Sequence, residues 1–482
     1  MHSEIKSFML SFILIAVLPN IALVVLAAWL DLGRPYVNLD YLLAAVLMFT
    51  KLRWLGMTLF VVFFATDVLA LLAQIFQFIR LDNLIYLSKF VLQAPSEYQF
   101  SILGIFALFF CLTVLFWHIP KLTNAKHALV MLNIGLMAYG VYVYSDSTNT
   151  DKLWRLAENH IVGSPTLHTI EHRSRGFLQT FNMDGPAFSG EKPASATALW
   201  QERERQPAPK MLLVVSESWG VPVNTDVQKQ LLAPLARLGN KILWQAEGEL
   251  QFHGATVAGE LREICNLSPN HFNLRDVTER FDTCLPNYLR SLGYQTSALH
   301  GASGVLYDRI YWYPRAGFDE ITFFENKVWE RRCYSYPGAC DFEAIKVAEA
   351  ALAQPGKQFF YWLTLNSHAI YDLRDLVIDV FDCNKYAIPS NSQVCRNLKL
   401  QAQFFFSLAQ SIEAGNFSGV EVIIVGDHDP IITNLEEKAA HFVDNKVPWI
   451  KFSIRDNKTE FHSVLHGNVA AVTNHTNTKL SK

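Results

Sequence analysis

Apolar side chains fill the first 145 positions in long runs that contain few charges. Five runs fit membrane-crossing helices: 8–30, 36–50, 54–78, 100–119 and 127–144. At about 1.5 Å per residue, all but the short second run come near or exceed the roughly 30 Å of a bilayer core. The pattern predicts an N-terminal all-α transmembrane bundle of about five helices over residues 1–145.

Two features of these runs allow a second interpretation. A secretory signal peptide could explain the first run, but the run is long, lacks a small-x-small exit and is followed by more apolar runs. Asp67 falls within the third run, where a carboxylate is costly in lipid. We expect Asp67 to have a structural role inside the bundle, with a substrate contact as the alternative.

Basic residues between the runs predict the topology. Five fall on one side of the bundle and three on the other: Lys6, Lys51, Arg53, Lys121 and Lys126 against Arg34, Arg80 and Lys89. This positive-inside bias places the N-terminus in the cytoplasm, and an odd number of crossings places the C-terminal part outside. We therefore predict a multi-pass protein of the bacterial inner membrane with its catalytic domain in the periplasm.

The polar stretch 146–209 differs from both neighbouring parts of the chain. It holds short amphipathic pieces at 151–161 and 198–206, which are typical of helices that lie on a membrane surface. The Pro-rich segment 206–210 then ends the helical pattern. We expect a juxtamembrane linker over 146–209.

From residue 210 onward, short apolar runs alternate with helical patterns. The runs 211–217, 294–300, 357–365, 420–427 and 447–453 are nearly continuous, which indicates strands buried on both faces. Helical spacing covers 227–238, 257–267, 341–353 and 397–414. The alternation predicts an α/β domain with a mostly parallel sheet over 210–482.

Composition supports a membrane protein with an exported domain. Charged residues make up 18%, against roughly 25% in soluble proteins, and the net charge of −3 argues against a nucleic-acid partner. Six cysteines lie in the C-terminal domain, an even set that suggests disulfides outside the cytoplasm. Nearest neighbours give the simplest of fifteen connectivities: 265–284, 333–340 and 383–395. Zinc binding by the thiols is the alternative, but the chain has no C-x-x-C pair.

Three predicted strands end in side chains that can bind a metal or an anion. Glu217 follows the first strand, His300 the second, and Asp427 and His428 the fourth. In a parallel sheet these ends share one edge, so the Glu217 and Asp427 carboxylates and the His428 imidazole could hold one divalent metal ion, Zn²⁺ or Mn²⁺. Taken singly, such residues are more often helix caps or solvated loop residues.

Thr256 opens the predicted helix 257–267, where unpaired N–H groups and the helix dipole favour a phosphate. A metal beside its hydroxyl would make Thr256 nucleophilic. The alternative is that Thr256 is only an N-cap, with His253, His271 and Glu260 in structural roles.

The motifs ESWG, LNSH, GDH and VPWI, with the helix-opening threonine, resemble the alkaline phosphatase/sulfatase superfamily. Within it, the chain is similar to the membrane-anchored lipoteichoic acid synthases and phosphoethanolamine transferases. The resemblance implies Glu217, Thr256, Asp427 and His428 as metal ligands, with Thr256 the nucleophile. It implies substrate contacts by five further residues: His300, Tyr307, Arg309, His368 and His441.

The chain departs from the family in ways that bear on its substrate. No C/S-x-P-x-R motif follows Thr256, which counts against sulfate-ester hydrolysis, and Tyr307 stands where tryptophan is more common. For Arg309, pairing with Asp308 or Asp319 is the alternative to a phosphate contact. The CYSYPGAC segment is similar to the transferases and not to the synthases.

The resemblance implies that a phospholipid donor gives its head group, phosphoethanolamine or phosphoglycerol, to a periplasmic glycan or glycolipid acceptor. The intermediate would be a phosphodiester on Thr256. Three alternatives remain: a phosphodiesterase or sulfatase-type hydrolase, a catalytically silent membrane sensor or scaffold, and a transporter, which the lack of a repeat disfavours.

Overall fold

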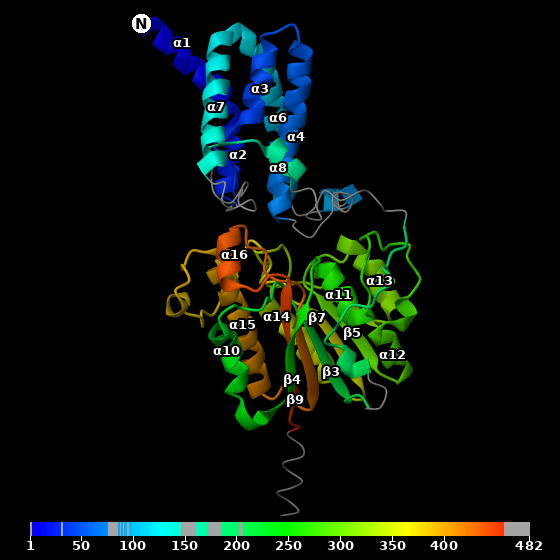
Figure 1. Ribbon diagram of the computed structural model, residues 1–482. Coiled ribbons are helices and arrows are strands. Elements are labelled where there is room, and N and C mark those ends of the chain that lie inside the picture. The colour runs from blue at the N-terminus through cyan, green and yellow to red at the C-terminus, as the bar shows by residue number, and fades with distance from the viewer. Residues whose placement is uncertain are drawn as a thin grey trace, which may run out of the picture. The chain divides into compact units, whose positions relative to one another are not determined.

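The computed structural model describes residues 2–29, 32–75, 85–86, 88–89, 91–93, 96–145, 161–171, 185–201 and 206–456. Residues 151–160 of the first predicted amphipathic piece lie outside them. The chain forms two compact units, one of residues 1–183 and 431–440 and one of residues 184–430 and 441–482. Figure 1 shows the helical first unit and the α/β second unit.

The first unit is a helical bundle, as predicted. Its helices are α1 (His2–Phe12), α2 (Leu18–Trp29), α3 (Leu39–Met48), α4 (Arg53–Ile75), α6 (Ser96–Leu122), α7 (Ala125–Ser145) and the short α8 (Pro165–Glu171), with a π-helical turn at Ile13–Val17. Among the described residues, three helical stretches are long and apolar enough to cross a membrane: Glu4–Trp29, Arg53–Gln74 and Gln99–Leu122. These helices mark a membrane protein.

The second predicted span is only partly helical. The ten residues of α3 cover about 15 Å, half of a bilayer core. The residues before it, 32–38, are not helical, yet most of them are buried. Side chains satisfy their backbone: Gly33 N–H donates to Gln74 Oε1 at 2.9 Å, and Gln74 Nε2 donates to the Gly33 carbonyl at 3.0 Å. Non-helical backbone can persist among membrane helices only when it is satisfied in this way.

The linker segment 161–171 packs within this unit. Strand β2 (Val162–Gly163) pairs in parallel with β1 (Val37–Asn38). Ser164 Oγ donates to Asp40 Oδ1 at 2.5 Å, and the Thr166 N–H donates to Asp40 Oδ2 at 3.1 Å. This part of the linker therefore folds against α3.

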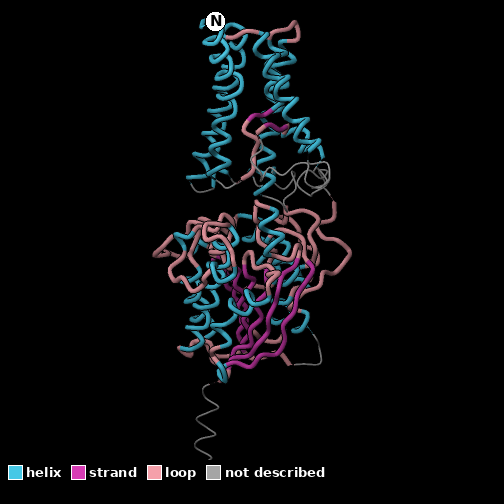
Figure 2. The backbone as a smooth tube through the Cα atoms, turned by 60° about the vertical axis from the view of Figure 1, so that its left-hand side comes forward, coloured by secondary structure: helices cyan, strands magenta, loops and turns pink. Residues whose placement is uncertain are grey.

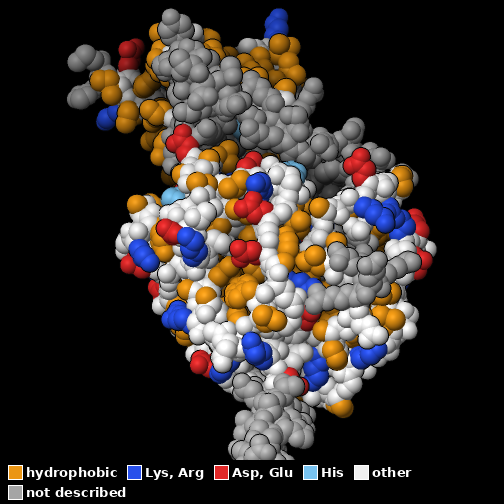
Figure 3. Space-filling view, turned by 60° about the horizontal axis from the view of Figure 1, so that its bottom comes forward, with side chains coloured by type: hydrophobic (Ala, Val, Ile, Leu, Met, Phe, Trp, Pro, Cys, Tyr) orange, Lys and Arg blue, Asp and Glu red, His pale blue; other side chains and the backbone are white. Residues whose placement is uncertain are grey.

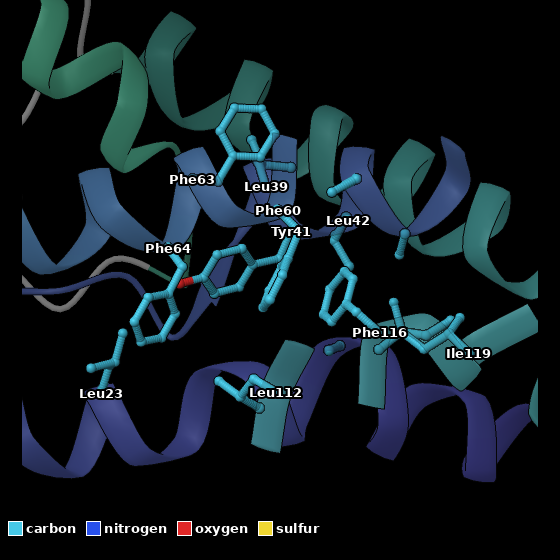
Figure 4. Packing of buried hydrophobic residues seen from close by; sticks show 14 of the residues in the cluster. Leu23, Leu39, Tyr41, Leu42, Phe60, Phe63, Phe64, Leu112, Phe116 and Ile119 are labelled. Atoms are coloured by element: carbon cyan, nitrogen blue, oxygen red, sulfur yellow. The ribbon is translucent and has the colours of Figure 1, made fainter. Parts of the chain in front are cut away.

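Aromatic rings fill the centre of the bundle (Figure 4). Phe60 of α4 stacks on Phe116 of α6 with ring centroids 3.8 Å apart, and Tyr41 of α3 lies against both rings. All three are fully buried. Burial of such rings stabilises the bundle and holds α3 between the longer helices.

A buried ion pair lies in the same bundle. Arg34 Nη2 lies 2.7 Å from Asp67 Oδ2, and Arg34 Nε lies 3.1 Å from Asp67 Oδ1. Asn38 Nδ2 and the Tyr41 hydroxyl also donate to Asp67 Oδ2, at 3.0 and 2.9 Å. The negative charge of Asp67 is therefore balanced by Arg34, and its oxygens accept hydrogen bonds, which supports its structural role.

The second unit is built on a seven-stranded sheet in the order β4-β9-β8-β3-β7-β5-β6, seen as the magenta strands of Figure 2. Its strands are β3 (Lys210–Ser216), β4 (Ile242–Gln251), β5 (Gln295–His300), β6 (Glu320–Thr322), β7 (Gln358–Leu363), β8 (Val420–Gly426) and β9 (Lys446–Ile454). Five adjacent strands, β8 to β6, run parallel, and β9 pairs antiparallel with β8 on one side and with the edge strand β4 on the other. The predicted mostly parallel sheet is confirmed.

Helices cover both faces of this sheet (Figure 1). On one face lie α10 (Thr225–Ala236) and α15 (Gln393–Glu413), and on the other lie α11 (Thr256–Cys265), α12 (Leu285–Ser291) and α13 (Arg309–Ala316). The remaining helices of this unit are α14 (Asp341–Leu352) and the short α9 (Ala198–Gln201) within the second amphipathic piece. Helix α16 (Leu435–His441) falls, except for its last residue, in the segment 431–440 of the first unit. All four predicted helices are present.

Three disulfides join the pairs expected from their proximity: Cys265–Cys284, Cys333–Cys340 and Cys383–Cys395. On the face of this unit in Figure 3, Lys and Arg side chains are interspersed with Asp and Glu side chains. Such a mixed surface is typical of a solvated domain.

Candidate active site and metal centre

Two adjacent strands end in acidic and imidazole side chains. β3 leads into Glu217 and β8 into Asp427 and His428, with Ser216 and Gly426 paired at the last register position. Because parallel strands share their carboxyl edge, these side chains meet. His428 Nε2 lies 3.5 Å from Glu217 Oε1 and 3.3 Å from Asp427 Oδ2. All three are buried.

The Thr256 hydroxyl lies beside the same cluster. Its Oγ1 is 3.3 Å from Glu217 Oε2 and 3.4 Å from His428 Nε2. Thr256 is the first residue of α11, the N-cap position belongs to Ala255, and no side chain caps the helix there. The alternative that Thr256 serves only as an N-cap therefore does not hold.

Helix α11 is fixed to the end of β8 by two residues that the sequence analysis missed. A Cβ at Gly259 would lie 2.7 Å from the Asp427 carbonyl oxygen, so only glycine permits this close approach. Arg262 donates through Nη2 to the Gly426 carbonyl at 2.6 Å and through Nη1 to the Asp427 carbonyl at 3.2 Å. A lone glycine inside an amphipathic helix was the available signal.

Hydrogen bonds from distant residues fix the backbone of Glu217. Its carbonyl accepts hydrogen bonds from Ser367 Oγ at 2.7 Å and Gln401 Nε2 at 2.6 Å, and its N–H donates to Thr364 Oγ1 at 2.9 Å. These partners lie 147 to 184 residues away in sequence. No local pattern could have indicated them.

The cluster has the donor set of a divalent-cation site. Asp427 Oδ1 accepts the Ser218 and His428 N–H groups at 2.7 and 2.6 Å, whereas the buried Oδ2 accepts no hydrogen bond from the part of the chain that the structure describes. His428 Nδ1 lies 2.8 Å from the Asp429 carbonyl, which fixes a proton on Nδ1 and leaves the Nε2 lone pair facing the acids. Burial, and then the charge of Asp427, raises the pKa of Glu217 well above its ordinary value. A cation would relieve this repulsion, so these residues fit a metal ion.

A family model covers the part of the chain that carries most of this site. Residues 251–447 match the model described as Sulfatase. Over these residues the chain is similar to the Sulfatase family. We call its α/β unit the sulfatase-like domain. No curated protein matches the chain.

Solved structures show distant similarity. A lipoteichoic acid synthase from Listeria monocytogenes is 18% identical with a TM-score of 0.41, covering 52% of this chain and 65% of its own. A phosphoglycerol transferase from Streptococcus pyogenes is 15% identical with a TM-score of 0.38, and the match covers 56% of this chain and 80% of the transferase. A lipooligosaccharide phosphoethanolamine transferase from Neisseria meningitidis is 14% identical with a TM-score of 0.37, and the match covers 87% of this chain and 84% of the transferase.

Two further predicted histidines lie at strand ends of the sulfatase-like domain. His300 ends β5, and His368 follows β7. Burial, and then the charge of Arg309, lowers the pKa of His300 well below its ordinary value. Burial also lowers the pKa of His368 to about 4. Both rings are therefore neutral near pH 7. Nδ1 of each ring faces a carbonyl oxygen, of Leu363 and of Ala369, so each neutral ring carries its proton on Nδ1 and leaves Nε2 as an acceptor.

Arg309 has a partner that the sequence analysis did not foresee. Its Nη2 and Nε lie 2.6 and 2.9 Å from Glu260 Oε2, and both side chains are buried. The expected alternative partners are wrong: Asp308 accepts backbone N–H groups, and Asp319 pairs with Arg290. Glu260 therefore has the expected structural role: it lies one turn after Thr256, and its ion pair with Arg309 joins α11 to α13.

Tyr307 and His441 complete the predicted set. Tyr307 is half-buried in a left-handed conformation (φ 57°), with the Arg309 guanidinium 5.1 Å from its ring centre. Burial raises the pKa of Tyr307 to about 12, so its hydroxyl stays protonated. His441 ends α16, and its carbonyl accepts the Val223 N–H at 2.9 Å. Among the described residues the acid–imidazole cluster does not include His441, whose substrate role stays a prediction.

Proposed function

We propose that this protein transfers a phospholipid head group, phosphoethanolamine or phosphoglycerol, to a periplasmic glycan or glycolipid through a phosphodiester on Thr256. The observation that carries the proposal is the position of the Thr256 hydroxyl, within 3.4 Å of both Glu217 and His428. A helix-opening hydroxyl set against an uncompensated acidic cluster is the arrangement that a metal-activated nucleophile requires.

Glu217, Asp427, His428 and Thr256 would hold the divalent ion, Zn²⁺ or Mn²⁺. Once bound, such an ion lowers the pKa of the hydroxyl and polarises a phosphoryl oxygen. Thr256 Oγ then attacks phosphorus, and the bond from phosphorus to the glycerol oxygen of diacylglycerol breaks. Diacylglycerol leaves and takes up a proton, while the head group stays on Thr256.

The second step reverses the first with another alcohol. An acceptor hydroxyl attacks the same phosphorus, and Thr256 Oγ leaves as its bond to phosphorus breaks. A bound phosphoryl group would raise the pKa of His300 and His368 and favour the doubly protonated rings, whose Nε2–H groups would donate hydrogen bonds to phosphoryl oxygens in both steps. Arg309 would add positive charge, reduced by its pairing with Glu260.

The membrane helices support a lipid donor. A domain tethered to the bilayer meets lipid head groups at a high effective concentration, which a free enzyme would not. In the proposed topology the site lies in the periplasm, where lipid and glycan acceptors are both present.

A hydrolase on the same site is the second candidate, and the match to the Sulfatase family model favours it. Water would then take the place of the acceptor in the second step. The two functions separate in one assay, because a hydrolase releases the free head-group phosphate whether or not an acceptor is added.

The test compares envelope glycans and glycolipids by mass in cells that carry the wild-type gene, no gene or the Thr256→Ala variant. We expect the added head-group mass only with the wild type, and a loss of at least about 10³-fold with Thr256→Ala, the effect of removing a nucleophile. Thr225→Ala is the matched control, since Thr225 also opens a helix but is exposed. Unchanged glycans with Thr256→Ala would refute the proposal.

A further inference from the structure

The loop closed by the Cys333–Cys340 disulfide lies directly on the strand end that carries His300. The Ala339 N–H donates to the Gly301 carbonyl at 2.8 Å, one residue after His300. A Cβ at Gly338 would lie 2.4 Å from the same carbonyl oxygen. The loop therefore packs against the end of β5 without room for adjustment.

The same loop is fixed to the segment after β7. Asn366 Nδ2 donates to Cys333 Sγ at 3.0 Å, and Asn366 lies two residues before His368. Near its start, the Tyr334 and Ser335 N–H groups donate to Asp375 at 2.9 and 2.7 Å. A short disulfide-closed loop is thus attached to both strand ends that carry the neutral histidines.

Tyr336 is the residue of this loop whose side chain contacts His368. Its ring lies against the His368 ring, with centroids 4.7 Å apart and an interplanar angle of 52°. Tyr336 and His368 are both half-buried, whereas Ser335 before Tyr336 and Gly338, Ala339 and Cys340 after it are buried. A half-exposed aromatic ring contributes less to the core than a buried one, so burial alone does not explain why the Tyr336 ring packs against His368.

We propose that Tyr336 is a substrate-positioning residue, and that its ring and His368 form one wall of the site for the organic part of the head group. This inference rests on the proposed function. An aromatic face attracts the ammonium group of ethanolamine and packs against the C–H groups of glycerol. With the phosphate held at Thr256, such a wall fixes the direction in which the head group points.

The test measures kcat and KM of the full-length protein in lipid nanodiscs, with phosphatidylethanolamine and with phosphatidylglycerol as donors. We expect Tyr336→Ala to raise the donor KM about tenfold with little change in kcat, and Tyr336→Phe to keep the wild-type KM. A rise confined to phosphatidylethanolamine assigns the ring to the ammonium group, and equal rises assign it to shared C–H contacts.

Tyr334→Ala is the matched control. Tyr334 is on the same loop, but it is 52% exposed and its ring is covered by Arg374 at 4.0 Å, so its removal should leave the KM unchanged. A double Cys333→Ser, Cys340→Ser variant should reproduce the KM rise, while Cys383→Ser with Cys395→Ser should not. An unchanged donor KM in Tyr336→Ala would overturn the inference.

Cleavage of a small aryl phosphodiester separates this outcome from failure of the proposed function. If the wild type cleaves that ester but transfers neither head group, the proposed transfer fails. Inhibition of the cleavage by free phosphoethanolamine and glycerol phosphate then tests Tyr336. Weaker inhibition in Tyr336→Ala supports the wall, and equal inhibition overturns it.

Discussion

Each unit of the protein buries a charged cluster, and the two clusters differ in how their charges are balanced. In the membrane unit, the Asp67 carboxylate receives the Arg34 guanidinium and two further donors. In the sulfatase-like domain, Glu217 and Asp427 converge, and among the described residues no Lys or Arg forms an ion pair with either. A balanced cluster is complete by itself, whereas an unbalanced one needs a cation from outside.

The largest stability effect should come from unbalancing the membrane cluster. Asp67→Leu leaves the buried Arg34 charge without its partner, and we expect a loss of about 3–5 kcal/mol of stability. Thermal unfolding of the full-length protein in detergent measures this loss. Arg34→Met combined with Asp67→Leu removes both charges and should recover most of it. A single variant no less stable than the double variant would show that the pair is not what holds the bundle.

A smaller effect should follow from pushing α11 away from the unbalanced cluster. Gly259→Ala places a methyl group against the Asp427 carbonyl, where overpacking costs about 1–3 kcal/mol. The resulting shift of Thr256 should lower transfer about tenfold. Gly190→Ala, where an added Cβ meets nothing within 4 Å, is the control. Wild-type transfer in Gly259→Ala would mean that the spacing of Thr256 and Asp427 is not critical.

Asp341 is a buried acid whose charge is balanced less fully than that of Asp67, since among the described residues it accepts hydrogen bonds from N–H groups and forms no ion pair. Its carboxylate accepts the Leu365 and Asn366 N–H groups, and burial raises its pKa to about 7. The folded protein then holds this proton more tightly than the unfolded chain, where the pKa is near 3.8. Its contribution to stability is therefore complete at low pH and is lost as pH rises through about 7.

Asp341→Asn should remove this pH dependence. Unfolding temperatures of the wild type and of Asp341→Asn, measured from pH 5 to 8.5, should differ most at pH 5, with the wild type the more stable, and converge toward pH 8.5. Parallel curves would show that Asp341 does not titrate in this range.

The strand-end cluster of the sulfatase-like domain could be predicted from the sequence because the strands carrying it are continuous apolar runs. Glu217, Asp427 and His428 each follow such a run directly, so their meeting depends only on the parallel order of β3 and β8. Strand β4 was not predicted from the sequence. It lies at the exposed edge of the sheet, so apolar and polar residues mix along it and form no apolar run. The Arg309 partner was also missed, because Glu260 lies 49 residues away and their contact depends on how α11 and α13 pack.

The membrane unit shows the same limit. The apolar run 36–50 predicts a span, but hydropathy does not show that helix begins only at Leu39. That start depends on the buried polar network around Arg34, whose partners come from separate segments. Hydropathy thus located the bundle, while side-chain hydrogen bonds determine where its backbone is helical.

Metal content of the purified full-length protein tests the central claim most directly. The account predicts one divalent ion per wild-type chain, loss of that ion in Asp427→Asn, and full retention in Asp67→Asn, because only the unbalanced cluster requires a cation. Wild-type metal content in Asp427→Asn would contradict it.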